Sequence, residues 1–98
     1  MFLHLGGDCV IKSKDIVAIL DTTSALKSKD SSAFLKTCEE EGFVKDISND
    51  EVRSFIIVEW IEKTNRLEKG THKIVVYKSS ISALTLQKRA GFINTFPT

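Results

Sequence analysis

One predicted β-strand carries large apolar side chains on both of its faces. Alternate residues of a strand point to opposite sides of a sheet, so in the segment 52–61 Ile56, Val58 and Trp60 share one face, and Phe55 and Ile57 share the other. A strand of this kind is typical of the centre of a sheet that is covered on both sides. The fold must therefore place apolar material on both faces of this strand.

The predicted partner strand, residues 72–78, has the same two-sided character. Two short helices are expected to be too small to cover both sheet faces. Either the sheet folds into two packed layers, or one apolar face is buried against another subunit, since monomers rarely expose large apolar patches. The second possibility favours a homo-oligomer. The residues expected at its interface are Phe55, Ile57, Val75 and Tyr77.

Shorter apolar runs separated by turn signals predict four more strands, at 2–5, 9–11, 16–20 and 43–47. The polar segments 21–24 and 27–32 are expected to form a linker. Together these patterns predict an α+β fold, with a mostly antiparallel curved sheet of about six strands and two short helices.

The two helices are predicted from their capping residues. The first covers 33–41, with Asp30 or Ser31 as its cap and Gly42 as its stop. The second is capped by Ser80 or Ser82 and ends at Ala90 before Gly91, after which an apolar tail at 92–96 is expected to dock on the domain or on a neighbour. The polar segment 62–70 suits a hairpin connection between the two long strands.

Length and charge limit the possible partners. The 98 residues fit a single domain, 1–98, and 14 basic residues nearly balance 13 acidic ones, so a nucleic-acid site must be a local patch. Neither a signal peptide nor a membrane-spanning stretch is apparent, which predicts a cytoplasmic protein without a membrane partner. In that compartment the two cysteines, Cys9 and Cys38, are expected to be buried apolar residues and not a disulfide.

Catalytic and metal motifs are weak in this sequence. His4 and His72 each lie in a predicted strand, and no motif pairs either with a nucleophile and an orienting carboxylate. The histidines and cysteines lack the paired spacing of zinc sites, and Gly6-Gly7 has no phosphate-loop motif around it. The chain is therefore expected to be no enzyme, to hold no metal or cofactor, and to act on no small-molecule substrate.

Two segments near the start, LHLGGD and KDIVAILD, resemble the RemA/RemB family of bacterial extracellular-matrix regulators, and are most similar to its RemB branch. The resemblance continues through EEEGFVKDIS, VRSFIIVEW and HKIVVYKSSISALTLQKRAGF, with residues 61–71 as an apparent hairpin insertion. It implies transcription regulation of biofilm-matrix operons, and in the RemA branch DNA binding by a ring-shaped homo-oligomer.

Five basic residues are the candidates for contact with the DNA phosphate backbone. They are Lys12, Lys14, Arg53, Lys88 and Arg89. A ring would repeat each weak patch around the assembly, so many cations could contact phosphates together. However, the resemblance implies a Gly-Arg-Arg-Thr-Arg run in the RemA branch, and the matching stretch here is Asn49-Asp50-Glu51-Val52-Arg53, in which only Arg53 is retained. Asp15 likewise stands where the resemblance implies an arginine.

The sequence thus predicts a cytoplasmic bacterial regulator of matrix genes that binds DNA with low sequence specificity as a homo-oligomer. The alternative is an oligomeric protein-interaction or scaffold module that does not touch DNA. Asp50 and Glu51 favour this alternative, because acids at contact positions repel phosphate.

Overall fold

A four-stranded sheet in the order β3-β5-β6-β4 forms the centre of the molecule. The computed structural model describes residues 1–63, 65 and 69–91, and the predicted apolar tail lies outside them. The strands are β1 (Phe2–Gly6), β2 (Cys9–Lys12), β3 (Ile16–Asp21), β4 (Val44–Asp46), β5 (Ser54–Glu62) and β6 (Thr71–Ser79). The helices are a 3₁₀ turn, η1 (Ser13–Asp15), and α1 (Thr22–Lys27), α2 (Lys29–Glu40) and α3 (Ala83–Arg89).

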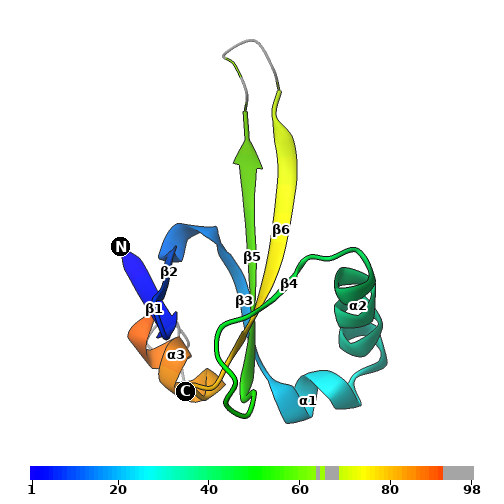
Figure 1. Ribbon diagram of the computed structural model, residues 1–98, viewed down its shortest axis with the longest axis vertical. Coiled ribbons are helices and arrows are strands. Elements are labelled where there is room, and N and C mark those ends of the chain that lie inside the picture. Colours follow the sequence, from blue (N-terminus) through cyan, green and yellow to red (C-terminus); the bar gives the residue numbers. More distant parts are fainter. Residues whose placement is uncertain (64, 66–68, 92–98) are drawn as a thin grey trace.

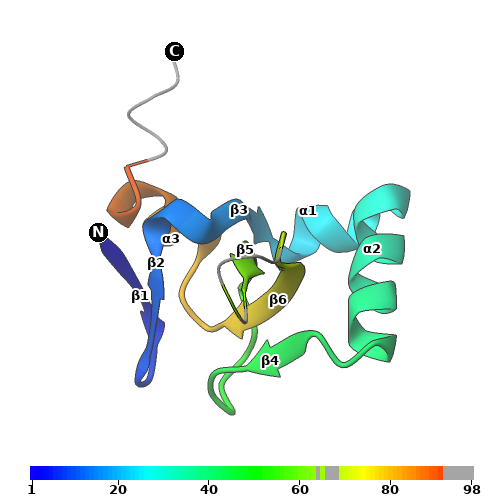
Figure 2. The ribbon, with the colours of Figure 1, turned by 90° about the horizontal axis from the view of Figure 1, so that it is seen from above.

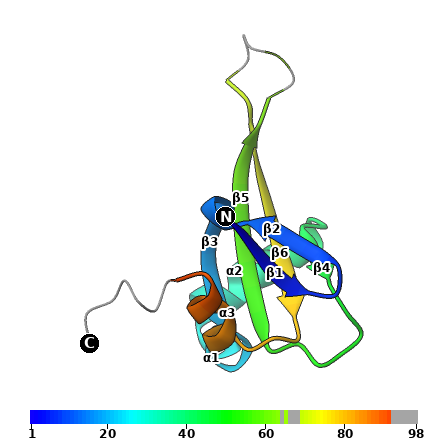
Figure 3. The ribbon, with the colours of Figure 1, turned by 90° about the vertical axis from the view of Figure 1, so that its left-hand side faces the viewer.

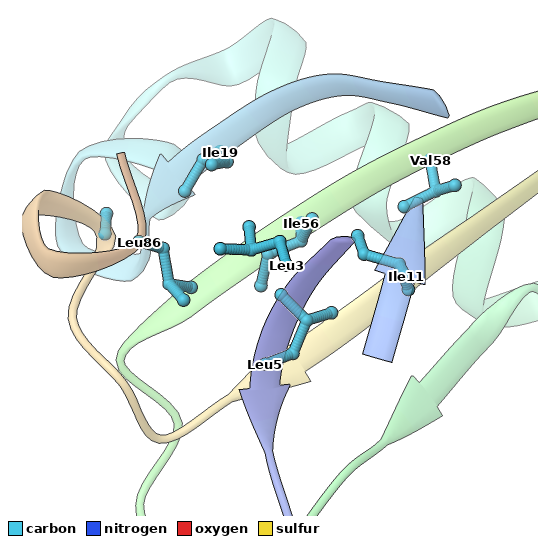
Figure 4. Close-up of a cluster of buried hydrophobic side chains, with 8 residues drawn as sticks. Leu3, Leu5, Ile11, Ile19, Ile56, Val58 and Leu86 are labelled. Atoms are coloured by element: carbon cyan, nitrogen blue, oxygen red, sulfur yellow. The ribbon is translucent and has the colours of Figure 1, made fainter. Parts of the chain in front are cut away.

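The central strand β5 separates two hydrophobic clusters. The β1–β2 hairpin and α3 lie on one side of the sheet, and α1 and α2 lie on the other (Figures 1 and 2). Ile56 and Val58 of β5 pack toward the hairpin and α3, together with Leu3, Leu5, Ile11, Ile19 and Leu86 (Figure 4). Phe55 and Ile57 pack on the opposite face with Ala25, Leu35, Cys38 and Val76. The predicted alternation along β5 is confirmed.

The β1–β2 hairpin covers a face that the sequence appeared to leave open. Its turn contains Gly6 and Gly7, both at positive φ, a conformation that glycine adopts without a steric penalty. The pairing places Leu3 opposite Ile11, and both point inward. This second, two-stranded sheet packs on the first, so of the two possibilities that the sequence left open, the structure has packed layers within one chain.

The predicted linker contains a helix, α1, that the sequence analysis missed. Asp21 caps it, because its carboxylate accepts a hydrogen bond from the Ser24 amide at 3.0 Å. The next helix, α2, then starts at Lys29 with Ser28 as its cap, so the prediction of Asp30 or Ser31 as the cap is wrong. The predicted stop at Gly42 is confirmed.

The fold class is α+β as predicted, with two differences in detail. The six strands form two sheets, not one curved sheet, and β4 runs parallel to β6, so the larger sheet is mixed. Residues 1–63, 65 and 69–91 also contain three α-helices where two were expected. Of the two predicted caps for α3, Ser82 is confirmed by the Thr85 amide, which donates to its hydroxyl at 3.2 Å.

Strands β5 and β6 extend beyond the rest of the sheet as a two-stranded arm. Pairing of β3 with β5 ends at Ile16 opposite Val58, and pairing of β4 with β6 begins at Val44 opposite Val76. Among the described residues, the four pairs from Glu59–Ile74 to Glu62–Thr71 therefore have no further strand on either side. Figures 1 and 3 show this arm projecting from the body. Within the described part of the chain, no helix has the length and apolar character needed to cross a membrane.

Candidate nucleic-acid interface

All five candidate DNA-binding residues have exposed side chains. Lys12, Lys14, Arg53, Lys88 and Arg89 each reach solvent. The ion pairs among the described residues involve other cations, namely His72, Lys73 and Lys78. The five candidates are therefore free of carboxylate partners in the part of the chain that the structure describes.

Lys12 and Lys14 lie together at the base of the arm. Lys12 ends β2 on the outward side, opposite Phe2, and Lys14 lies in η1, which is anchored by the Ser13 amide donating to the Met1 carbonyl at 3.0 Å. Both lysines line a cleft of about 500 Å³ beside β5. The same cleft contains Trp60, His72 and the acid Asp15, so it combines cations with an aromatic ring and one carboxylate that has no described ion pair.

Arg53 is held in place by its backbone and leaves its side chain free. Its amide donates to the Ser79 carbonyl at 2.8 Å, and its carbonyl accepts from the Thr22 amide at 3.3 Å. These bonds fix the segment just before β5. The side chain of Arg53 is exposed, as are those of Asp50 and Glu51 nearby in the loop, and no ion pair joins them among the described residues.

Lys88 and Arg89 lie in the last turn of α3, where cations interact favourably with the helix dipole. The neighbouring residues orient this helix. Leu86 is fully buried, and the Gln87 side-chain amide donates to the Ile19 carbonyl of the edge strand β3 at 3.1 Å. The basic residues that follow are consequently presented to solvent.

The five cations do not form a single patch. Arg53 precedes the first residue of β5, whereas Lys14 lies beside Ile16, whose partner is Val58. Five strand residues at about 3.3 Å each separate these positions by roughly 17 Å. The structure thus brings Lys12 and Lys14 together and leaves Arg53 at the opposite end of the body.

The four predicted interface residues do not share a surface. In the register of β5 with β6, Val75 pairs with Val58 and Tyr77 with Ile56, so both lie on the face opposite to Phe55 and Ile57. Phe55, Ile57 and Val75 are only 7%, 9% and 9% exposed within one chain. Their apolar character is explained by the core of the subunit, and it no longer argues for a second copy.

A different apolar surface was missed by the sequence analysis. Phe2 and Val10 are 67% and 54% exposed on the outer face of the β1–β2 hairpin, diagonal to each other across the two strands. The alternation of Leu3 and Leu5 with Phe2 and His4 was the signal that could have identified it, because it assigns opposite faces to these residues.

The cysteines and histidines have local roles. Cys38 is buried on the helix side of the sheet, as predicted, and Cys9 packs against the cluster on the other side. Burial raises the pKa of both thiols, although Lys45 opposes this effect at Cys9. His4 Nε2 donates to the Gly7 carbonyl at 2.6 Å, and His72 Nδ1 donates to Glu59 at 2.9 Å. Within residues 1–63, 65 and 69–91, no three potential metal ligands lie together.

These features define a small α+β fold in which the larger sheet is covered on both faces, with cations at several surface positions that have no ion pair among the described residues. The family model of the extracellular matrix regulatory protein A-like proteins (RemA-like) matches residues 2–90. The chain therefore belongs to this family, and the match covers every helix and strand described above. It does not separate the RemB branch from the RemA branch, so similarity to RemB stays a prediction. The comparison with curated proteins gave no match.

Proposed function

We propose that this protein is a cytoplasmic bacterial regulator of extracellular-matrix genes that binds the DNA phosphate backbone as a homo-oligomer. Membership of the RemA-like family supports the regulatory role. The observation that carries the DNA-binding part is the exposure of Lys12, Lys14, Arg53, Lys88 and Arg89 without ion-pair partners among the described residues. Their side chains need not break any described ion pair to contact phosphate.

The separation of these cations explains why an oligomer is part of the proposal. Each subunit offers Lys12 with Lys14 at one end and Arg53 at the other, and repetition in a symmetric assembly would give one duplex many such contacts. Phosphate contacts of this kind position a protein on DNA but carry no direct sequence information. Low sequence specificity is the expected result.

The exposed outer face of the β1–β2 hairpin supports self-association. Phe2 and Val10 are the large apolar side chains of this face, and Met1 next to them is 90% exposed. Burying this surface against a second copy removes apolar area from water without disturbing the core of either subunit.

Fluorescence anisotropy with a labelled matrix-promoter duplex and a scrambled duplex of equal length, over a series of salt concentrations, tests the proposal. We expect similar affinities for both duplexes and a steep decrease in affinity with salt, about 0.9 in log-log slope for each phosphate contact. Arg53→Ala should weaken binding to both duplexes, while Lys36→Ala on the helix side should not. Failure of the parent protein to bind either duplex at low salt would refute DNA binding.

A scaffold role without DNA contact is the second candidate. It is favoured by Asp50 and Glu51, which are exposed immediately before Arg53 and would repel phosphate there. If Asp50→Asn with Glu51→Gln strengthens DNA binding, these acids limit an existing site. If the parent protein and this variant both fail to bind while the oligomer persists, the scaffold role is the better account. Under either role we propose that the protein has no catalytic activity, cofactor or small-molecule substrate.

A further inference from the structure

A pocket of about 270 Å³ lies between the helices α1 and α2 and the central sheet, on the face opposite to the β1–β2 hairpin (Figure 2). The register of the strands builds its floor, because Phe55 is the direct partner of Lys78 and Val44 is the direct partner of Val76. The helices supply its walls through Leu26, Leu35, Lys36 and Glu39. Every lining residue belongs to a described helix or strand, so the shape of the pocket follows from how these elements pack.

The interior of this pocket is apolar. Leu35, Phe55 and Val76 line it and belong to the hydrophobic cluster on the helix side of the sheet. Among the described residues, the one buried side-chain polar atom without a hydrogen-bond partner is the Ser13 hydroxyl, which is not part of this pocket. A buried water needs two to four polar partners, and apolar cavities do not hold it. The interior is therefore suited to an apolar group of a ligand.

Leu26 indicates where such a group would enter. It lines the pocket and yet is 60% exposed, so it lies at the mouth. An apolar chain that passes the mouth would cover this side chain and remove its surface from water, which is favourable.

The volume of the pocket limits the size of the ligand. At about 30 Å³ for each molecule of liquid water, 270 Å³ has room for roughly nine non-hydrogen atoms. Pockets for drug-sized ligands measure about 300–1,000 Å³, so this pocket is at the small end of the range. It is too small for a nucleotide or a long acyl chain, and it fits an unbranched chain of about six to eight carbons.

Charged side chains at the rim select the head group of the ligand. The Lys78 side chain is only 26% exposed, and its Nζ lies 4.0 Å from Asp46 Oδ1, which is beyond hydrogen-bond distance. Lys36 is exposed and takes part in no ion pair among the described residues. Glu39 is the one acid of the lining, so the two lysines leave an excess of positive charge. A carboxylate that approached Lys78 to about 2.8 Å would form the charge-assisted hydrogen bond that this ammonium lacks with Asp46.

We infer that this pocket binds a medium-chain monocarboxylate of about six to eight carbons, with its alkyl chain against Phe55 and Val76 and its carboxylate at Lys78 and Lys36. The ligand undergoes no reaction. Such a site adds a ligand-binding function that the proposed DNA binding does not require, because it lies on the helix side of the sheet and uses none of the five candidate DNA-binding residues.

Titration of the ¹⁵N-labelled protein with hexanoate, octanoate and dodecanoate, followed by amide NMR shifts, tests the site in the parent protein. We expect saturable shifts at the amides of Leu26, Val44, Phe55 and Val76. Each methylene buried between hexanoate and octanoate should raise the affinity about fourfold. The further methylenes of dodecanoate should add little, because the pocket is then full.

Two variants test the two parts of the ligand. Val44→Phe fills the pocket and should reduce octanoate affinity at least about tenfold, whereas Val17→Phe, on the exposed side of β3, is the matched control and should bind like the parent. Lys78→Met keeps the length of the side chain without its charge. It should weaken octanoate binding about tenfold and leave the affinity for octan-1-ol unchanged. Unchanged circular dichroism spectra would show that the variants are folded.

Several outcomes would overturn the inference. Octanoate could cause no saturable shift, or it could shift the amides of the exposed β1–β2 hairpin as strongly as those of the pocket. An affinity that keeps rising to dodecanoate, or that survives Val44→Phe, would place the alkyl chain outside the pocket. If Lys78→Met bound octanoate like the parent, the rim would not recognise the carboxylate. None of these results bears on DNA binding, which the anisotropy experiment tests separately.

Discussion

Two buried serine hydroxyls connect the base of the central hairpin to the N-terminal hairpin and to the segment before α3. Ser54 and Ser79 are direct cross-strand partners and are fully buried. The Ser54 hydroxyl donates to the Ile81 carbonyl at 2.8 Å, and the Ser79 hydroxyl donates to the Leu5 carbonyl at 2.6 Å while accepting from the Ile81 amide at 3.0 Å. These bonds satisfy backbone groups that would otherwise be buried without a partner.

Ser79→Ala should lower the free energy of unfolding by about 1–3 kcal/mol, because it leaves the Leu5 carbonyl buried and unpaired. Urea denaturation followed by circular dichroism measures this change. Ser24→Ala is the matched control, since Ser24 is exposed and should change stability by less than about 0.5 kcal/mol. Equal stabilities of the two variants would show that the Ser79 hydroxyl is not needed.

Three weakly acidic side chains make the folding stability of the protein depend on pH in the alkaline range. Burial raises the pKa of Cys9, Cys38 and Tyr77, and at Tyr77 the neighbouring Cys9 adds to the effect. The folded protein therefore holds these protons more tightly than the unfolded chain. Stability should be fully retained below the unfolded-state pKa values and should fall as pH rises through the window between those and the raised folded-state values. A urea midpoint that does not fall from about pH 8 to about pH 10.5 would contradict this assignment.

At the scale of elements, the end of α2 shows how one residue determines a change of direction. Gly42, at φ +79°, donates its amide to the Glu39 carbonyl, and the Phe43 amide donates to the Cys38 carbonyl at 2.8 Å. This is the Schellman arrangement, which ends a helix and satisfies its last carbonyls. The chain then enters β4 parallel to β6.

Gly42→Ala should destabilise the protein by about 1 kcal/mol, because a left-handed backbone is costly for a residue with a Cβ. No atom lies within 4 Å of the position that this Cβ would occupy, so the cost is conformational and not steric. Thermal unfolding of the variant and of the parent measures it. A loss of several kcal/mol would instead indicate a clash that the structure does not contain.

The sequence predicted most strands because their apolar alternation is a local signal. It missed α1 because Thr22, Thr23 and Ser24 have low helix propensity, and the helix depends on the Asp21 cap and on burial of Ala25. The parallel pairing of β4 depends on where α2 delivers the chain, which no local pattern encodes. For the candidate site, the exposed cations could be predicted one by one. The pairing of Lys12 with Lys14 follows from their closeness in the sequence. The placement of Trp60 beside them depends on the register between β3 and β5, and so it could not be predicted.

At the scale of the whole molecule, the two apolar faces of β5 are covered within one subunit, so self-association must use other surfaces. Phe55 belongs to the core and Phe2 to the outer face of the β1–β2 hairpin. The two residues have the same side chain in opposite environments. A substitution at Phe55 therefore tests the stability of the subunit, whereas the same substitution at Phe2 tests its self-association.

Phe55→Asp should unfold the domain, because it buries a charge and removes a core ring at a cost of at least about 3–5 kcal/mol. Phe2→Asp should leave the subunit folded, with an unchanged circular dichroism spectrum, and should reduce the mass measured by light scattering to that of a smaller species. A parent protein that is monomeric at micromolar concentration, or a Phe2→Asp variant with the parent's mass, would exclude assembly through this face.

The bond from Ser79 to Leu5 joins residues 74 positions apart, and the Gln87 bond to Ile19 joins residues 68 apart. During synthesis on a ribosome, at roughly 5–20 residues per second, the N-terminal hairpin must therefore wait several seconds for the residues that complete its core. Throughout that interval Leu3, Leu5 and Ile11 are without their final partners β5 and α3. A nascent chain that stalls before α3 emerges would keep these apolar side chains exposed, and chaperones or proteases would bind it. The N-terminal half of the protein can therefore complete its core only after translation has reached α3.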